Sequence, residues 1–346
     1  MNQAANRAPL LLTMGDPCGI GPEIVAKAFA QGQLQDTVVV ADPQVMRRAQ
    51  AAIGKTGPVV VLPSLADARG VPPGCLSVWP APGLPPGLAE LPWGQVHAQA
   101  GAGAAACIEA ATRAVLRGEA SGLITAPLHK EALAAAGVKY PGHTEMLQAL
   151  AAEFVGRPLP VRMMLANDEL RVVLVTIHVA LRKAIDMLSR PLIEETLHIT
   201  DAALRRFGIA QPRIAVAGLN PHAGEGGLFG DEEVQLIAPA IAAVRAAGLD
   251  VHGPYAPDTV FMRARHAANH PGEFDAVVAM THDHGLIPVK YLGVEQGVNV
   301  TLGLPLVRTS PDHGTAFDLA GTGRADPSSL VAALHMARRL VVGHAG

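Results

Sequence analysis

Residues 13–28 read TMGDPCGIGPEIVAKA and set how the chain begins to fold. The stretch follows the apolar residues 10–12 and leads into a helical pattern, which predicts a strand, a tight turn and a helix. The turn does not fit a dinucleotide fingerprint, because Ile24 stands where the third glycine belongs, and it lacks the lysine of a phosphate-binding loop. Two interpretations stay open: Gly19 and Gly21 only permit the turn, or they also contact a cofactor.

Short β-branched apolar runs alternate with longer alanine-rich stretches along the rest of the chain. This pattern is typical of a parallel sheet covered by helices. The expected strands are residues 9–14, 37–41, 121–125, 171–177, 213–219 and 275–280, and the expected helices are 21–31, 103–119, 231–248 and 327–343. Residues 98–106 predict the start of a tightly packed helix, which Glu109 and Arg113 continue as an i,i+4 pair. Residues 71–94, rich in proline and glycine, predict an irregular connection.

The composition narrows the class of protein. At 346 residues, 49% of them hydrophobic and 16% charged, the chain is long enough for one large core or two ordinary ones. The net charge of −3 is spread over interspersed signs, which argues against nucleic acid or a membrane as partners. The apolar residues 8–14 are too short for a membrane span and lack the features of a secretory signal. Three widely spaced cysteines, Cys18, Cys75 and Cys107, indicate free thiols and a reducing compartment. We therefore expect a soluble cytoplasmic protein, and the charge pattern favours a small molecule as its partner.

Three of the 14 histidines share a context, because each comes within three residues of the end of a predicted strand. They are His178, His222 and His282. Parallel strands end at one edge of a sheet, so the three imidazoles can meet there. Imidazole binds zinc, cobalt and similar ions, and three protein ligands leave coordination positions open for substrate. The pattern leaves two interpretations open: a shared divalent metal, or three unrelated loop histidines.

Other polar residues suit an anionic substrate. These residues are His143, Thr144, Lys290, Asn299 and Arg308. His143 and Thr144 begin a helical stretch, where a hydroxyl and free backbone N–H groups can bind phosphate or carboxylate. Lys290 and Arg308 lie in otherwise apolar stretches of sequence, and their positive charges can bind anionic oxygens. Two carboxylates, Asp258 and Asp283, can orient a histidine or accept a proton.

Six motifs together resemble one known family. They are GDPCGIGPEI at 15–24, GHTE at 142–145, TIHVALRKAI at 176–185, GLNPHAGEGG at 218–227, HDHGLIPVKYLG at 282–293 and the long block at 297–326. Over nearly the whole chain they look like the 4-hydroxythreonine-4-phosphate dehydrogenases of pyridoxal phosphate biosynthesis, the PdxA family. The block at 297–326 is highly specific.

The resemblance implies an α/β fold of two lobes, like the isocitrate and isopropylmalate dehydrogenases, with the active-site cleft between the lobes. One discontinuous lobe, carrying much of the nucleotide site, is expected at residues 1–135 and 305–346. The second lobe, with the metal ligands and the dimer contact, is expected at residues 136–304. The family is a homodimer with the metal site at the subunit interface, so the three histidines need not all come from one chain.

The same resemblance implies roles for individual residues. His178, His222 and His282 are expected to bind one divalent metal, which is zinc, magnesium, cobalt or manganese, and His143, Thr144, Lys290, Asn299 and Arg308 to contact substrate. The nucleotide, NAD or NADP, is expected on the loop 312–326, at His313, Gly314, Thr315, Ala316, Asp318 and Gly321. Lys290 or Asp258 is the expected proton acceptor. The chain departs from the family at His284, where the usual sequence is HDQG.

The reaction that the resemblance implies is metal-dependent oxidation of 4-phosphohydroxy-L-threonine by NAD or NADP. The β-keto acid formed loses carbon dioxide to give 3-amino-2-oxopropyl phosphate. Three alternatives remain: a related dehydrogenase of erythronate phosphate, threonate phosphate or a carboxylated dihydrodiol; a metal-dependent hydrolase; and a noncatalytic sensor of phosphorylated metabolites. The retained GHTE motif favours a phosphorylated aliphatic substrate over a dihydrodiol. A hydrolase has no need for the loop 312–326.

Overall fold

The computed structural model describes residues 8–343 and divides into two compact units. Of these residues, unit 1 comprises 8–159 and 304–341, and unit 2 comprises 160–303 and 342–343. Each unit combines helices with a sheet, so the predicted α/β class in two lobes is confirmed.

The first lobe extends further along the chain than the expected boundary after residue 135. The chain stays in unit 1 as far as Leu159 because α5 (His143–Val155) packs against α3 (Ala98–Leu116). His143 and Thr144 therefore belong to unit 1 and not to the lobe that the sequence analysis assigned them.

Unit 1 holds six parallel strands in the order β3-β4-β2-β1-β5-β12. Their bounds are β1 (Leu10–Thr13), β2 (Thr37–Val40), β3 (Val59–Val61), β4 (Leu76–Trp79), β5 (Gly122–Thr125) and β12 (Arg308–Pro311). The expectation of an irregular connection over 71–94 is wrong at β4. Leu76 and Val78 alternate with less buried neighbours, and this short period-two pattern lies among the prolines and glycines that hid it.

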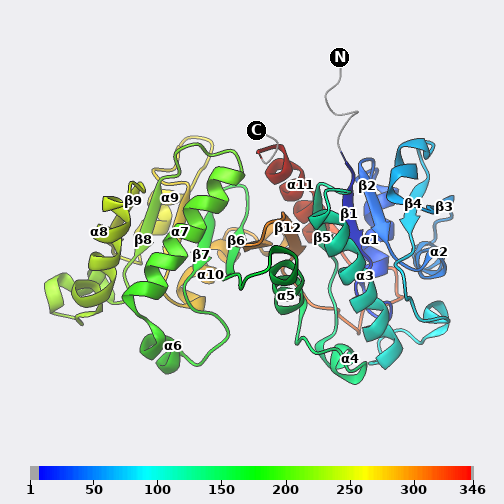
Figure 1. The fold of residues 1–346 in the computed structure, drawn as a ribbon, viewed down its shortest axis with the longest axis horizontal. Helices are drawn as coiled ribbons and strands as arrows, with labels where there is room; N and C mark the ends of the chain where they lie inside the picture. The colour runs from blue at the N-terminus through cyan, green and yellow to red at the C-terminus, as the bar shows by residue number, and fades with distance from the viewer. Residues whose placement is uncertain (1–7, 344–346) are drawn as a thin grey trace, which may run out of the picture. The chain divides into compact units, whose positions relative to one another are not determined.

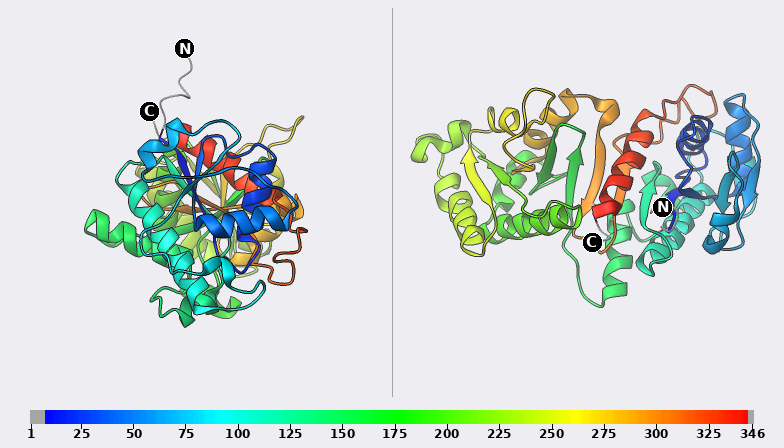
Figure 2. Two further views of the ribbon diagram at one scale, coloured as in Figure 1. Left: turned by 90° about the vertical axis from the view of Figure 1, so that its right-hand side faces the viewer. Right: turned by 90° about the horizontal axis from the view of Figure 1, so that it is seen from above.

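Helices cover both faces of this sheet. They are α1 (Gly21–Ala30), α2 (Pro43–Ala52), α3, α4 (Lys130–Ala135), α5 and α11 (Ser328–Gly343), with short 3₁₀ turns η2 (Leu65–Gly70) and η3 (Leu88–Glu90). Within unit 1, α3 lies in front of β1 and β5 in Figure 1, and α11 lies on the other face, as Figure 2 shows. The hydroxyl of Thr309 donates to the carbonyl oxygen of Ala333 at 2.9 Å and ties β12 to α11.

The opening stretch forms the predicted strand, turn and helix. A Cβ on Gly21 would lie 2.3 Å from the backbone oxygen of Met14, so only glycine fits this close approach. Glu23, in the first turn of α1, accepts a hydrogen bond of 2.8 Å from the backbone N–H of Ala325. The turn therefore packs directly on the loop 312–326.

Gly101 gives a first testable prediction about unit 1. A Cβ at Gly101 would lie 2.0 Å from the backbone oxygen of Ala132, where α3 meets α4. We expect Gly101→Ala to lower the free energy of unfolding by about 1–3 kcal/mol, because the overpacked backbones must separate. Urea unfolding measures the change. Gly70→Ala is the matched control, since a Cβ there has nothing within 4 Å, and an equal loss in both variants would contradict the packing argument.

Unit 2 holds a mixed sheet in the order β11-β6-β7-β10-β8-β9. Its strands are β6 (Arg162–Ala166), β7 (Arg171–Leu174), β8 (Ile214–Ala217), β9 (Val251–Tyr255), β10 (Ala276–Ala279) and β11 (Val298–Leu302). The expected all-parallel sheet is wrong here, because β6 is antiparallel to both β7 and β11. The side chain of Asn167 accepts from the backbone N–H groups of Glu169 and Leu170 and closes the turn that reverses the chain.

Helices also cover the sheet of unit 2. They are α6 (Leu181–Met187), α7 (Arg190–Arg206), the turn η4 (Pro221–Gly227), the π-helix η5 (Glu233–Ile237) running into α8 (Ala238–Ala246), α9 (Val260–Ala264), α10 (His282–Tyr291) and the turn η6 (Val294–Gln296). In Figure 1, α7 lies in front of this sheet and α10 behind it. The core includes Val172, Ala215 and Val277 from its central strands. In the described part of the chain, no helix is long and apolar enough to cross a membrane.

Candidate active site

Arg308 places a buried positive charge in unit 1. The residue is only 3% exposed, and its Nε and Nη2 groups donate to the Oγ1 of Thr125 at 3.2 and 2.7 Å. Burial lowers the pKa of Arg308 to about 10, and the nearby Glu145 acts in the opposite direction. The guanidinium is still protonated at neutral pH, so this end of β5 suits an anionic group.

His143 and Thr144 lie beside this cation as the first two residues of α5. The preceding residue, Gly142, makes no side-chain capping hydrogen bond, and the N-terminus of a helix favours an anionic group. Burial and the positive charge of Arg308 hold the pKa of His143 well below its usual range, although a backbone hydrogen bond with Ala126 opposes them. The structure thus brings neutral His143 near Arg308, and Thr144 follows His143 in the first turn of α5.

The lowered pKa of His143 predicts a pH-dependent stability. Below about pH 6.5 the unfolded chain protonates this imidazole while the folded chain, with Arg308 facing it, does not. Stability is therefore complete above pH 6.5 and is lost as the pH falls, by up to about 1.4 kcal/mol per pH unit. Urea unfolding from pH 8 to pH 5 should show a shallower slope in His143→Asn than in the unsubstituted chain. Equal slopes would show that His143 is protonated in the folded state.

The loop 312–326 lies in unit 1 and is fastened to α1. Lys27 donates through Nζ to the backbone oxygens of Gly323 and Ala325, at 2.8 and 2.5 Å. Of the six predicted nucleotide contacts, Thr315 is buried, Ala316 has φ +39°, Gly321 packs on Trp93, and His313, Gly314 and Asp318 are exposed. The loop has a fixed backbone and exposed polar groups, as a nucleotide-binding segment needs.

Three polar residues in unit 1 were missed by the sequence analysis. Asp16, His97 and His129 each have a buried side-chain atom without a hydrogen-bond partner among the described residues. His129 follows the predicted strand 121–125 by four residues, one more than the largest spacing shared by His178, His222 and His282, so a slightly wider spacing would have included it. Asp16 gave no such signal, because the turn motif was judged on its glycines.

In unit 2, two of the three predicted metal ligands come together. The rings of His178 and His282 lie 5.4 Å apart and line a cavity of about 440 Å³. The Nδ1 atom of His282 is hydrogen bonded to Asp283 at 2.7 Å, which leaves its Nε2 for another partner. His178 has φ +46°, a strained conformation for a non-glycine residue that functional sites often contain.

His222 is not among the residues that line the cavity of this pair. It opens a run of left-handed backbone at residues 222–226, and its ring is 6.1 Å from that of Phe229. Among the residues that the structure describes, no three His, Cys, Asp or Glu side chains are placed to hold one ion. A three-histidine site is therefore not assembled within a single described chain.

The remaining predicted residues of unit 2 are scattered over its elements. Lys290 lies in the last turn of α10, about 12 Å along the helix axis from His282. Asp258 is exposed in the turn before α9, and Asn299 is half-buried in β11. His284, which departs from the family pattern, is half-buried, and burial lowers its pKa. The roles of these residues stay predictions.

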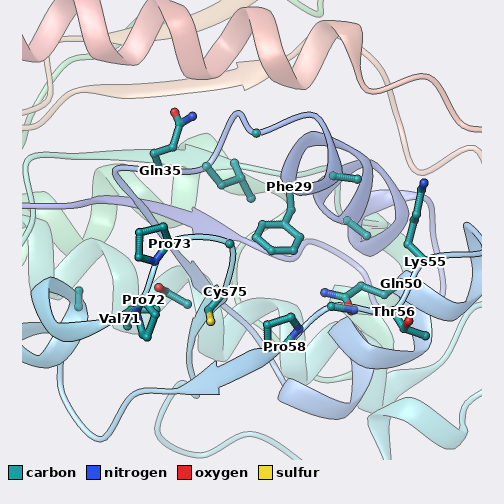
Figure 3. A pocket seen from close by; sticks show the side chains of 18 residues that line it. Phe29, Gln35, Gln50, Lys55, Thr56, Pro58, Val71, Pro72, Pro73 and Cys75 are labelled. Atoms are coloured by element: carbon teal, nitrogen blue, oxygen red, sulfur yellow. The ribbon is translucent and has the colours of Figure 1, made fainter.

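Unit 1 also contains a larger cavity, of about 780 Å³, lined from α1, the end of α2 and residues 55–58 and 68–77. Figure 3 shows Phe29 at its centre, between Gln50 on one side and Pro73 on the other. None of the residues predicted for substrate, metal or nucleotide lines this cavity. Its size does not make it the candidate active site.

A family model described as "Pyridoxal phosphate biosynthetic protein PdxA" matches residues 33–337. The chain belongs to the PdxA family. It is 52% identical over 336 residues to the 4-hydroxythreonine-4-phosphate dehydrogenase of Beijerinckia indica subsp. indica, covering 96% of this chain and 95% of the relative. It is 46% identical over 334 residues to the D-threonate 4-phosphate dehydrogenase of Pectobacterium atrosepticum, covering 96% and 98%.

Solved structures of the PdxA family agree with the fold. The crystal structure of a 4-hydroxythreonine-4-phosphate dehydrogenase from Klebsiella pneumoniae has a TM-score of 0.87 and 44% identity, covering 97% of this chain and 98% of that one. The family resemblance read from the motifs is confirmed, and the chain is an enzyme of the dehydrogenase class.

Proposed function

We propose that this PdxA family member oxidises 4-phosphohydroxy-L-threonine with NAD or NADP, in a metal-dependent reaction of pyridoxal phosphate biosynthesis. The β-keto acid formed would lose carbon dioxide to give 3-amino-2-oxopropyl phosphate. The observation that carries the proposal is the buried guanidinium of Arg308 beside the N-terminus of α5. The names of relatives at 46–52% identity support the class of reaction.

In unit 1, Arg308 and the start of α5 bind the negative oxygens of the substrate. Arg308 donates N–H groups in a fixed fork, while the free backbone N–H groups of α5 and the hydroxyl of Thr144 can donate as well. Neutral His143 avoids placing a second full charge next to Arg308. These contacts hold the substrate so that its carbinol carbon is positioned for hydride loss.

In unit 2, the residues fit a divalent metal in part. His178 and His282 would hold it, since the Asp283 contact at Nδ1 leaves Nε2 of His282 for coordination. A bound metal lowers the pKa of the substrate hydroxyl, so that oxidation proceeds near neutral pH. Lys290 or Asp258 receives the proton, and Asn299 contacts the substrate. We assign the nucleotide to the loop 312–326.

We further propose that the enzyme is a cytoplasmic homodimer and that its three-histidine metal site is completed between two copies. Val179, Leu181 and Ile287 line the cavity of His178 and His282 and are 38%, 64% and 64% exposed. Large apolar side chains so exposed around a polar site suit cover by a second copy of the chain. The free cysteines are consistent with a reducing compartment.

D-threonate 4-phosphate is the second candidate substrate. The relative from Pectobacterium atrosepticum that carries this activity in its name is 46% identical over nearly the whole chain. D-threonate 4-phosphate shares the phosphate, the carboxylate and the carbinol with 4-phosphohydroxy-L-threonine, and it has a hydroxyl in place of the amino group. The anion-binding residues of unit 1 therefore serve both compounds.

The test is reduced-cofactor formation by the purified protein with 4-phosphohydroxy-L-threonine, D-threonate 4-phosphate and 4-phosphoerythronate. Each is assayed with NAD and with NADP, before and after chelation, with magnesium, manganese, cobalt or zinc added back. We expect metal-dependent reduction, fastest with the amino acid phosphate. A higher kcat/KM with either sugar-acid phosphate would move the enzyme to that substrate. No reduction with any of them would return the hydrolase interpretation.

A further inference from the structure

Four segments of unit 1 are linked around the turn that carries Asp16. The turn after β1 carries Asp16 itself, and Gly94 donates its N–H to the backbone oxygen of Cys18 at 2.8 Å. The ring of His129, after β5, stacks on that of Phe317 in the loop 312–326, with centroids 4.6 Å apart and planes 15° from parallel. The loop assigned to the nucleotide therefore meets this turn.

Only one of the two carboxylate oxygens of Asp16 has a hydrogen-bond partner among the described residues. Asp16 is fully buried, and its Oδ1 accepts the N–H of Cys18 at 2.8 Å. Its Oδ2 has no hydrogen-bond partner in the described chain, and the same holds for Nδ1 of His129 and Nε2 of His97. An unsatisfied buried carboxylate oxygen is costly to a fold, so a donor that arrives with a ligand accounts for it.

The charges around Asp16 agree with a polar ligand. Burial raises the pKa of Asp16, while the hydrogen bond from Cys18 and the positive potential of His129 and His97 lower it. The stack on Phe317 fixes the plane of the His129 ring. Unit 1 thus offers one acceptor, on Asp16, and two histidines whose charges act on it and whose ring nitrogens can donate.

The geometry points to Asp16 and His129 as the residues that bind the carboxamide of the nicotinamide ring. Oδ2 of Asp16 accepts an N–H of the amide, and Nδ1–H of His129 donates to its oxygen. The inference rests on the nicotinamide cofactor of the proposed function and deepens it, because it names the residues that recognise the reactive end of that cofactor. Both act on the cofactor by positioning its ring.

Binding of NAD and of 3-acetylpyridine adenine dinucleotide to the unsubstituted protein provides the first measurement, by titration calorimetry without substrate. The analogue keeps the carbonyl group attached to the pyridine ring but has a methyl group where NAD has the amide nitrogen. It therefore leaves Oδ2 of Asp16 without a donor. We expect NAD to bind at least about tenfold more tightly than the analogue. Equal dissociation constants would overturn the inference without any variant being needed.

Two variants separate the partners. Asp16→Asn keeps the shape and turns an acceptor into a donor, so the preference for NAD should fall to within about twofold of none. His129→Phe keeps the stack on Phe317 and removes the donor, so both nucleotides should bind more weakly while the preference remains. The control is Asp36→Asn, a carboxylate of unit 1 that pairs with Arg338 at the surface and should change neither constant.

The outcomes also distinguish this inference from the proposed function. If the protein binds neither NAD nor NADP, the cofactor assignment fails, and the inference fails with it. If NAD binds and supports turnover but Asp16→Asn keeps the full preference, only the inference is wrong. Thermal unfolding of each variant, compared with Asp36→Asn, shows whether the fold is intact before the constants are compared.

Discussion

Replacing His222 by alanine is expected to lower turnover at least about a thousandfold and to remove the bound metal. Among the described residues, His222 is not grouped with His178 and His282 as a metal ligand, and its ring contacts that of Phe229. The expected loss follows from removing one of three ligands of a catalytic ion that activates the substrate hydroxyl. Metal content after dialysis and kcat at saturating substrate measure it, with circular dichroism to confirm the fold.

His335→Ala is the matched control for this variant. Its ring is exposed in α11 and bonded to Gln33 at 2.9 Å, within unit 1, so metal content and turnover should not change. An active His222→Ala protein with its metal retained would remove His222 from the ligand set.

Mixing two inactive variants tests whether the site is shared between copies. His222→Ala and His282→Ala subunits, exchanged into heterodimers, would leave one intact site per heterodimer if these ligands come from different chains. Random exchange then restores about a quarter of the activity. Recovery of no activity, in a mixture shown to contain heterodimers, would place both histidines in the site of one chain.

Replacing Arg308 by alanine is expected to raise KM far more than it changes kcat. The guanidinium is buried and charge-assisted hydrogen bonds to an anionic substrate are worth about 1.5 to 3 kcal/mol, which corresponds to a ten- to 150-fold higher KM. Initial rates over a wide range of substrate concentration separate the two constants. Because the change also leaves Thr125 without its partner, urea unfolding accompanies the kinetics.

The control for Arg308 is Arg47→Ala, which removes an exposed arginine from α2 in the same unit. It should leave KM unchanged. An Arg308→Ala protein that is folded and has the KM of the control would show that this cation does not bind substrate. An unchanged KM with a large loss of kcat would instead show that Arg308 stabilises the transition state more than the bound substrate.

The secondary structure of unit 1 was largely legible in the sequence. The apolar runs at 9–14, 37–41 and 121–125 became β1, β2 and β5, because a strand buried on both faces needs continuous apolar residues. The i,i+4 pair of Glu109 and Arg113 forms in α3, at 3.1 Å. β4 escaped because its two buried residues are too few to stand out against the prolines around them.

The direction of the strands in unit 2 could not be predicted from the sequence. The run at 171–177 predicted β7, but nothing in an apolar pattern says whether its neighbour runs parallel or antiparallel. That outcome depended on a short turn at Asn167 and on a strand, β6, which the sequence analysis did not predict. Pairing is a contact between segments, and a single segment carries little information about it.

The family, the α/β class and the residue types available for chemistry could all be predicted from the amino-acid sequence, because motifs and periodicity are local properties of short segments. Which of these residues meet depends on how distant segments pack. The tertiary structure placed Arg308 on Thr125, 183 positions away, and His178 beside His282, and it left Oδ2 of Asp16 without a hydrogen-bond partner among residues 8–343. Burial sets the pKa of His143 and Arg308 in the same way. Distances and desolvation arise only when distant segments pack together, so no stretch of the chain contains them.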